Sequence, residues 1–379
     1  MDFNNTQIAY SYKTKKELKS ALFVYQIITK PFMVSLGKFF LKVALLLHIP
    51  IKPFTNFMFK QFCGGENLDE VLKISNNLSK NNVKSIPDYS IEGVSDESAF
   101  NNLISEVKKV IDIAAENNNI PFAVFKPTGL IDAEYLKQTT PDNHPEVLAF
   151  SKRMDKIFSY ASKKTVRVLI DAEDYMFQQR IDDILLQFMK QYNKETVIVF
   201  TTLQMYRTDR LDYLEFLIEM AKRENFKLGI KFVRGAYMEK ERNRAAEGNY
   251  PDPIYPNKAD TDAAYDEAIK ISVENIEFVE IFNCTHNEDS VSNLIHLMKE
   301  HNLAKNDKRI WTSQLYGMRD NISFNLAKEG YNVAKYLPYG PVKHVMPYLV
   351  RRAEENSSMS SQAGKEIEML KEEINKRKL

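Results

Sequence analysis

Short apolar runs alternate with longer amphipathic stretches along the chain after residue 80. The apolar runs are rich in β-branched residues and have the length of strands, whereas the stretches between them repeat their apolar positions with a helical period. The predicted strands span residues 83–91, 121–126, 166–172, 196–202, 227–233, 277–283, 309–314 and 332–337. The predicted helices include residues 96–118, 145–162, 175–192, 210–223, 260–274 and 289–300.

Regular alternation of strand and helix predicts an α/β protein with a parallel sheet. Eight such units over about 250 residues have the size and count of a (β/α)8 barrel. An open, doubly wound sheet is the alternative. No glycine-rich turn of the kind that cradles a dinucleotide follows the first predicted strand, which disfavours that alternative.

The two ends of the chain differ from this pattern. We expect an N-terminal helical region at residues 1–80, a catalytic barrel at 81–360 and a C-terminal helical tail at 361–379. Residues 18–63 are rich in Phe, Leu, Ile and Val, and carry six lysines and no acid. They form helices packed on the main domain or a basic amphipathic surface in peripheral contact with a membrane, and the two can coexist.

Two further segments have a composition of their own. The tail is amphipathic but weakly apolar, which predicts a solvated helix. Residues 243–258 contain Pro251, Pro253 and Pro256 and are predicted to be irregular rather than helical. This segment is a candidate lid over a cofactor, with Lys258 as its functional member.

Composition narrows the class of protein. The chain has 379 residues, of which 44% are hydrophobic and 27% are charged, as in an ordinary globular protein. A net charge of +1 disfavours nucleic acid as a partner. The two cysteines form neither a disulfide framework nor a metal-binding spacing. With no secretory signal or clear transit peptide at its start, we expect a cytoplasmic protein, with peripheral attachment to the inner membrane as an addition.

Polar side chains follow nearly every predicted strand, where barrel enzymes carry their chemistry. They are Lys126, Asp171, Gln204, Lys231, Arg234 to Tyr237, Thr285 to Asn287, Gln314 to Met318, and Tyr336. Arg351 and Arg352 follow an apolar helical stretch. They are either a solvated helix end or two guanidinium forks for a carboxylate or phosphate. Because cations outnumber acids here, we expect anionic ligands: a substrate carboxylate and a cofactor phosphate.

Several of these segments together resemble the proline dehydrogenase family over residues 80–356. They are Phe125–Leu130 (FKPTGL), Leu169–Glu173 (LIDAE), Lys231–Arg242 (KFVRGAYMEKER), Thr285–Asn287 (THN), Gln314–Met318 (QLYGM) and Tyr348–Asn356 (YLVRRAEEN). The resemblance implies an FAD-dependent enzyme with a distorted (β/α)8 barrel. Its members oxidise L-proline to Δ1-pyrroline-5-carboxylate by hydride transfer to the flavin N5, and pass the electrons to a membrane quinone. This reaction is the first step of proline catabolism.

The resemblance also implies a role for individual residues. Those next to the reaction would be Lys126, Asp171, Tyr237, Tyr336, Arg351 and Arg352. Lys126, Arg351 and Arg352 would grip the substrate carboxylate, and Ala236, Leu315, Tyr336 and Tyr348 would enclose the substrate ring. FAD would be held by Gln204, Lys231, Arg234, Gly235, Lys258, Thr285, His286, Asn287, Gln314 and Glu355. No residue is assigned to a metal.

Some alternatives stay open. The lysine at position 231 resembles the monofunctional, mitochondrial-type branch, so a separate pyrroline-5-carboxylate dehydrogenase is expected to oxidise the product. A hydroxyproline dehydrogenase is the nearest alternative, although Tyr336 would crowd a 4-hydroxyl group. More distant alternatives are a barrel lyase that uses Lys126 as a Schiff base and a non-enzymatic scaffold.

Overall fold

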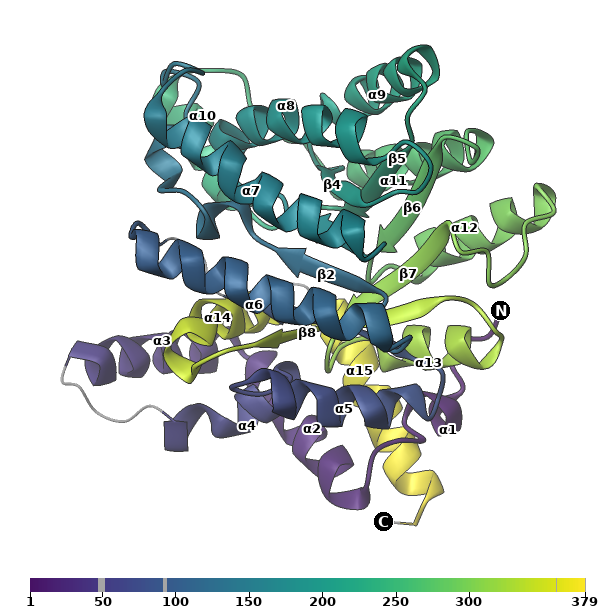
Figure 1. The fold of residues 1–379 in the computed structure, drawn as a ribbon. Helices are drawn as coiled ribbons and strands as arrows, with labels where there is room; N and C mark the ends of the chain where they lie inside the picture. The colour runs from purple at the N-terminus through teal and green to yellow at the C-terminus, as the bar shows by residue number, and fades with distance from the viewer. Residues whose placement is uncertain (47–51, 91–93, 359, 379) are drawn as a thin grey trace. The chain divides into compact units, whose positions relative to one another are not determined.

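A computed structural model describes residues 1–46, 52–90, 94–358 and 360–378 of the chain (Figure 1). The chain forms two compact units. The terminal unit consists of Met1–Ser90 and Gln314–Leu379, and the central unit consists of Ile91–Ser313.

Eight strands carry the fold, and each lies within or beside a run predicted from the sequence. They are β1 Lys84–Tyr89, β2 Phe122–Phe125, β3 Arg167–Ile170, β4 Val199–Gln204, β5 Leu228–Val233, β6 Val279–Cys284, β7 Ile310–Leu315 and β8 Val333–Tyr339. Their order in the sheet is β1-β8-β7-β6-β5-β4-β3-β2 (Figure 1). From β2 to β8 chain neighbours are sheet neighbours, and β1 pairs with β8, whereas a doubly wound sheet reverses its strand order. The prediction of a (β/α)8-type fold is therefore confirmed.

The helices of the central unit connect its strands. They are α6 Glu97–Glu116, α7 Pro145–Lys163, α8 Tyr175–Tyr192, α9 Arg210–Glu224, α10 Met238–Gly248, α11 Lys258–Glu274 and α12 Glu288–Glu300, with 3-10 turns at Pro127–Gly129 and Ala133–Leu136. The side chains of Asp96, Asn257 and Asn287 accept from the amides of Ala99, Asp260 and Asp289. Each is an N-cap that stabilises its helix by about 1 kcal/mol. All six predicted helices match to within two residues at each end.

An aromatic cluster fills the inside of the central unit. The ring of Phe122 lies 5.5 Å from Phe200, 5.0 Å from Phe282 and 5.3 Å from Trp311, in edge contacts. These rings come from β2, β4, β6 and β7; Phe122, Phe200 and Phe282 are buried, and Trp311 is half-buried. Edge contacts of this kind stabilise aromatic pairs beyond the area they bury.

The prediction that residues 243–258 are irregular was wrong for its first part. Helix α10 runs from Met238 to Gly248, and Asn249 ends it in the left-handed conformation. Glu, Lys, Arg and Ala fill this stretch and favour a helix, and the prolines begin only at Pro251. Lys258 lies outside the irregular segment because it is the first residue of α11.

The terminal unit contains β1, β8 and the helices from both ends of the chain. They are α1 Thr6–Ala9, α2 Lys15–Ile28, α3 Pro31–Leu46, α4 Lys52–Phe62, α5 Leu68–Ser79, α13 Asp320–Lys328, α14 Val342–Ser358 and α15 Ser360–Lys376. One hydrophobic cluster joins α2 with α14 and α15, and includes Val24, Leu349 and Leu370. Helix α2 is thus packed in the core, as one of the two alternatives for residues 18–63 predicted.

The prediction that the C-terminal tail is solvated was wrong. On α15, Ala363, Met369 and Leu370 are buried, and so are the acids Glu366 and Glu373. The Tyr10 hydroxyl donates to Glu366 at 3.1 Å. The tail is weakly apolar by composition, yet its buried carboxylates find partners, so that helix α15 belongs to the core of the terminal unit.

Candidate active site

Three predicted site residues meet in the central unit. Lys126 follows β2, Asp171 follows β3, and Lys231 lies within β5. The Asp171 carboxylate lies 2.5 Å from Lys231 Nζ and 3.4 Å from Lys126 Nζ. Lys231 is 4% exposed, so the ammonium groups share their acid largely out of water. Two lysines thus share one carboxylate.

The electrostatics of the cluster keep Asp171 ionised. Burial raises the pKa of Asp171, but the charges of Lys231 and Lys126 outweigh it and hold the pKa below its ordinary value. Asp171 is therefore a carboxylate at neutral pH.

The segments FKPTGL and LIDAE are fastened to each other beside this cluster. The Thr128 backbone N–H and hydroxyl both donate to Glu173, at 3.2 and 2.6 Å. The Gln178 side chain in turn accepts from the Glu173 backbone N–H at 2.7 Å. These contacts fix the loop after Lys126 against the loop after Asp171. The Thr128–Glu173 pair was missed from the sequence, where both residues stand within quoted motifs but 45 positions apart.

Gln204 and Gly235 stand at the next two strand ends. Gln204, the last residue of β4, is 2% exposed, and its Oε1 accepts no hydrogen bond from the described residues. Gly235 follows β5 with a φ of +135°, and a Cβ there would lie 2.5 Å from the ring of Tyr206. The position therefore requires glycine. Tyr206, which packs against it, was missed from the sequence.

A second cluster of cations shares the carboxylate of Asp262 on α11. Arg234 Nε donates to Asp262 at 2.7 Å, and Lys258 forms an ion pair with the same side chain. Arg234 also donates to the hydroxyls of Thr285 at 2.6 Å and Ser290 at 3.0 Å. The cluster lies at the N-termini of α11 and α12, where backbone N–H groups favour anions. Asp262 was missed, although it follows Lys258 at a helical spacing of four.

The remaining predicted residues of the central unit lie directly before α10 and α12. Asn287 is the N-cap of α12, and His286 beside it is half-buried. Ala236 is exposed, and Tyr237, half-buried, precedes α10. The Lys240 ammonium lies 5.8 Å from the centre of the Tyr237 ring.

The other predicted site residues belong to the terminal unit. Gln314 is fully buried and accepts from the Ser323 hydroxyl at 2.5 Å. Leu315 ends β7, and Tyr336 lies within β8 at 3% exposure.

Three more of these residues share one face of α14. Tyr348, Arg351 and Arg352 are spaced by three and four residues, which brings them to the same side of a helix. The Arg352 guanidinium lies 5.0 Å from the centre of the Tyr348 ring and is 7% exposed. A buried guanidinium is not a solvated helix end, so Arg352 favours the second of the two alternatives stated for the arginine pair. The side chain of Glu355 lies outside the described residues.

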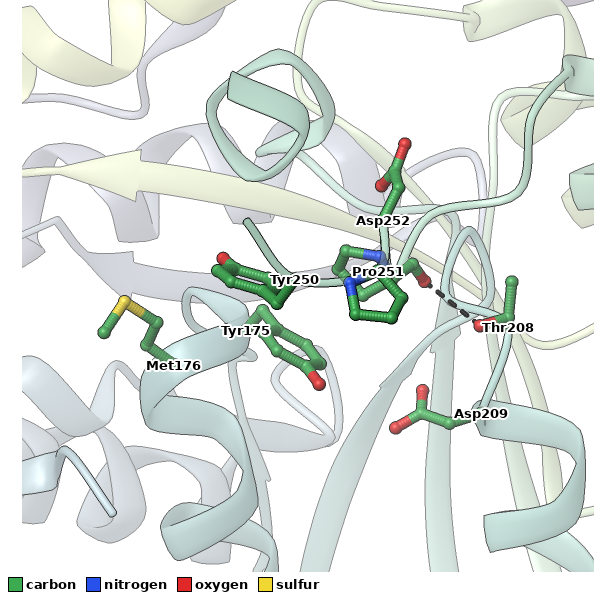
Figure 2. Close-up of a pocket in the computed structure, with 8 residues that line it drawn as sticks. Tyr175, Met176, Thr208, Asp209, Tyr250, Pro251 and Asp252 are labelled. Atoms are coloured by element: carbon green, nitrogen blue, oxygen red, sulfur yellow. Dashed lines mark hydrogen bonds between the residues drawn. The ribbon is translucent and has the colours of Figure 1, made fainter. Parts of the chain in front are cut away.

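The central unit also contains a cavity of about 420 Å³ (Figure 2). It is lined by Tyr175, Met176, Thr208, Asp209 and the segment Tyr250–Pro253. None of these is a predicted site residue. Asp209 is already engaged by Arg207 and Arg210, so the cavity offers little free charge for a ligand.

Comparison with known proteins gives a consistent result. The proline dehydrogenase family model matches residues 71–365. Proline dehydrogenase 1, mitochondrial, of Dictyostelium discoideum is 30% identical over 98% of this chain and 74% of its own length. The carbapenem antibiotics biosynthesis protein CarD of Pectobacterium carotovorum is 33% identical, over 83% of each chain. Hydroxyproline dehydrogenase of Xenopus laevis is 29% identical, over 84% of this chain and 78% of its own.

A solved structure agrees on the fold. The crystal structure of proline utilization A (PutA) from Bdellovibrio bacteriovorus, inactivated by N-propargylglycine, superimposes with a TM-score of 0.76 at 23% identity. The match covers 96% of this chain and 40% of that chain. With the family model spanning most of the sequence and this fold beneath it, the chain belongs to the proline dehydrogenase family of enzymes.

Proposed function

We propose that the protein oxidises L-proline to Δ1-pyrroline-5-carboxylate with bound FAD and passes the electrons to a membrane quinone. The observation that carries the proposal is the pairing of two cations with one carboxylate, once around Asp171 and once around Asp262. In each cluster two cations share one carboxylate, in a family whose substrate is an amino acid. Such clusters favour a carboxylate at one place and a phosphate at the other.

The residues of the central unit fit a flavin nucleotide. The buried Oε1 of Gln204 is an acceptor without a partner among the described residues, and it suits an N–H at the edge of a flat ring. Arg234 and Lys258, at the N-termini of two helices, suit a pyrophosphate, and Thr285 holds Arg234 in place. Lys231, Gly235, His286, Asn287, Gln314 and Glu355 complete the proposed set.

The flavin supplies an acceptor for two electrons and a hydride. The protein has to bind the amino acid in one orientation and exclude water. Arg351 and Arg352 would hold the substrate carboxylate with paired hydrogen bonds, and Lys126 would add a third cation. Asp171 would keep Lys126 in place, since their ion pair already restricts that flexible side chain. Tyr336, Tyr348, Leu315, Ala236 and Tyr237 would enclose the ring.

Substrate choice follows from Tyr336. Its ring is buried in β8, which leaves it little freedom to move aside for a 4-hydroxyl group. We therefore propose proline over trans-4-hydroxyproline, although one similar protein is a hydroxyproline dehydrogenase. Oxidation of the product by a separate pyrroline-5-carboxylate dehydrogenase belongs to the same proposal.

Contact with a membrane is proposed for helix α3. Phe32, Phe39 and Phe40 are 74%, 61% and 60% exposed, and Lys30 and Lys38 accompany them. Exposed aromatic rings beside lysines are typical of a helix that lies in the lipid headgroup region. Across the described residues, no helix combines the length and the hydropathy needed to cross a bilayer. A peripheral position would bring the enzyme to its quinone.

Two experiments test this function. The purified protein is expected to be yellow, and L-proline without oxygen is expected to bleach it; a colourless protein, or one that proline leaves unchanged, would refute the proposal. Borohydride trapping with a carbonyl substrate would label Lys126 only if the chain were a Schiff-base lyase.

Membrane contact needs a test of its own. Vesicles with anionic lipid are expected to sediment the wild-type protein, and the double substitution Phe39→Glu, Phe40→Glu is expected to abolish it. Phe216→Glu is the matched control, because Phe216 is 45% exposed on α9 of the central unit. Equal sedimentation of all three proteins would contradict the proposed surface.

A further inference from the structure

The turn that follows β7 is held by side chains as well as by its backbone, in which the Met318 N–H donates to the Leu315 carbonyl at 3.1 Å. Gly317, in this turn, has a φ of +76°, and a Cβ there would lie 1.9 Å from the backbone oxygen of Gln61. Only glycine fits so close to another backbone. The turn therefore lies directly against α4, which can supply hydrogen bonds in addition to those of the backbone.

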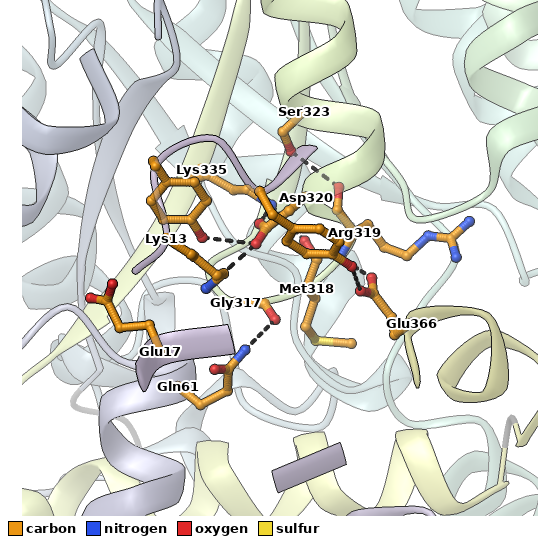
Figure 3. Close-up of polar contacts among 12 residues, drawn as sticks. Lys13, Glu17, Gln61, Gly317, Met318, Arg319, Asp320, Ser323, Lys335 and Glu366 are labelled. Carbon is orange, nitrogen blue, oxygen red and sulfur yellow. Dashed lines mark hydrogen bonds and ion pairs between the residues drawn. The ribbon is translucent and has the colours of Figure 1, made fainter. Parts of the chain in front are cut away.

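The carbonyl of Gly317 accepts two hydrogen bonds from N-terminal helices. The hydroxyl of Tyr25, on α2, donates to it at 2.8 Å, and the amide of Gln61, on α4, donates at 2.8 Å. Figure 3 shows the Gln61 amide directed at this carbonyl. Tyr25 is 1% and Gln61 is 9% exposed, so water has little access to replace either donor.

Strand β8 holds the rest of the turn. The Lys335 ammonium, fully buried, donates to the carbonyls of Met318 at 2.5 Å and Leu315 at 3.4 Å. Asp320 lies 2.9 Å from the same ammonium and balances its charge. Lys335 precedes Tyr336, so the two side chains point to opposite faces of the strand. One strand thus carries a proposed substrate-contacting ring and the group that fixes the turn.

We propose that Tyr25 and Gln61 are positioning residues for the substrate pocket, which act through Gly317 on Leu315. The inference rests on the proposed function, because Leu315 is taken as a wall around the substrate ring. Helices α2 and α4 would then contribute to substrate binding as well as to the packing of the terminal unit. Leu315 ends β7 two residues before Gly317, so a turn that loosens at Gly317 displaces this wall.

The test removes both donors from Gly317 while leaving the packing in place. In the double substitution Tyr25→Phe, Gln61→Met, KM for proline is expected to rise about tenfold, with kcat changed less than about threefold. Tyr192→Phe is the matched control: its hydroxyl donates to Asp155 in the central unit, far along the chain from the turn. It is expected to leave both constants unchanged.

A second readout needs no turnover. Hydrogen–deuterium exchange, followed by mass spectrometry, is expected to be faster in the peptide that contains residues 315–319 of the double variant, and unchanged in the control. If proline does not reduce the wild-type protein, the proposed function fails while the exchange result still tests the turn. Unchanged KM and unchanged exchange in the double variant would overturn the inference. So would lower stability with KM unchanged, because the two residues would then be structural only.

Discussion

The substitution Asp171→Asn tests whether a buried charge cluster organises the central unit. It removes one negative charge and keeps the size of the side chain. Asp171 lies 2.5 Å from Lys231 Nζ and 3.4 Å from Lys126 Nζ, so the variant leaves two ammonium groups without their shared counterion. We expect a lower free energy of unfolding of the central unit at neutral pH.

The expected loss can be worked from these distances. At an effective dielectric constant of about 20, charges 2.5 and 3.4 Å apart attract by about 7 and about 5 kcal/mol. Desolvation of the three groups and repulsion between the lysines offset most of this. Breaking a buried ion pair costs about 3–5 kcal/mol, and we expect the lower end because the Asp171 side chain keeps 18% exposure.

Trp311 offers a local probe for the assay. It is the single tryptophan of the chain, is half-buried, and packs 5.3 Å from the ring of Phe122 in the central unit. Urea unfolding followed by its fluorescence reports on this unit. Asp112→Asn is the matched control, since Asp112 pairs with Lys164 at 2.8 Å with both side chains exposed to solvent. Solvent screening limits its expected loss to below about 1 kcal/mol.

The dependence on pH separates a charge effect from a packing effect. The pKa of Asp171 is below its ordinary value in the folded protein, because the charges of Lys231 and Lys126 outweigh the effect of burial. Its contribution is therefore present above about pH 4 and is lost as the pH falls through the folded pKa. The difference between wild type and Asp171→Asn should shrink in acid. Equal losses for both variants, or a difference that does not change with pH, would refute the reasoning.

Four further predictions concern other parts of the molecule. Gly235→Ala should lower the free energy of unfolding about 1–3 kcal/mol more than Gly330→Ala, because both have positive φ but only the first Cβ meets a tyrosine ring; equal losses in thermal or urea unfolding would contradict this. Leu370→Ala should cost about 2–5 kcal/mol, since Leu370 is 1% exposed. The exposed neighbour Lys371→Ala should stay within about 0.5 kcal/mol, and matching values would mean that α15 is not part of the core. Tyr336→Ser should raise the ratio of kcat/KM for trans-4-hydroxyproline to that for proline, and an unchanged ratio would exclude the ring as the selective group. The kcat/KM for proline should rise between about pH 6 and about pH 10 until the bound amine is deprotonated, and a flat profile would argue against hydride transfer from a neutral amine.

Sequence periodicity was sufficient for the architecture. Apolar runs of strand length are buried on both faces in this fold, so each of the eight strands left a clear signal. Boundaries were less certain. Strand β4 begins at Val199 rather than at residue 196, because the Asn193 side chain accepts from the amides of Ile198 and Val199 and delays the ladder.

Both errors came from judging a segment by its overall composition. Helix α10 was missed because three prolines dominated the reading of residues 243–258, although they begin only after its end. Helix α15 was expected in solvent because its composition is polar. Its carboxylates are buried with partners such as the Tyr10 hydroxyl, which lies 356 positions away in the sequence. Composition cannot reveal partners at such a distance.

The sequence by itself determined the strand and helix order, the positions of the polar strand ends and the family to which the chain belongs. These follow from local patterns, because side-chain periodicity and short motifs lie within a few residues of one another. Only the tertiary structure decided that Lys126 and Lys231 share Asp171, that Thr128 is tied to Glu173, and that α2 and α4 hold the carbonyl of Gly317. Such pairings depend on which side chains packing brings together, and no local pattern records that.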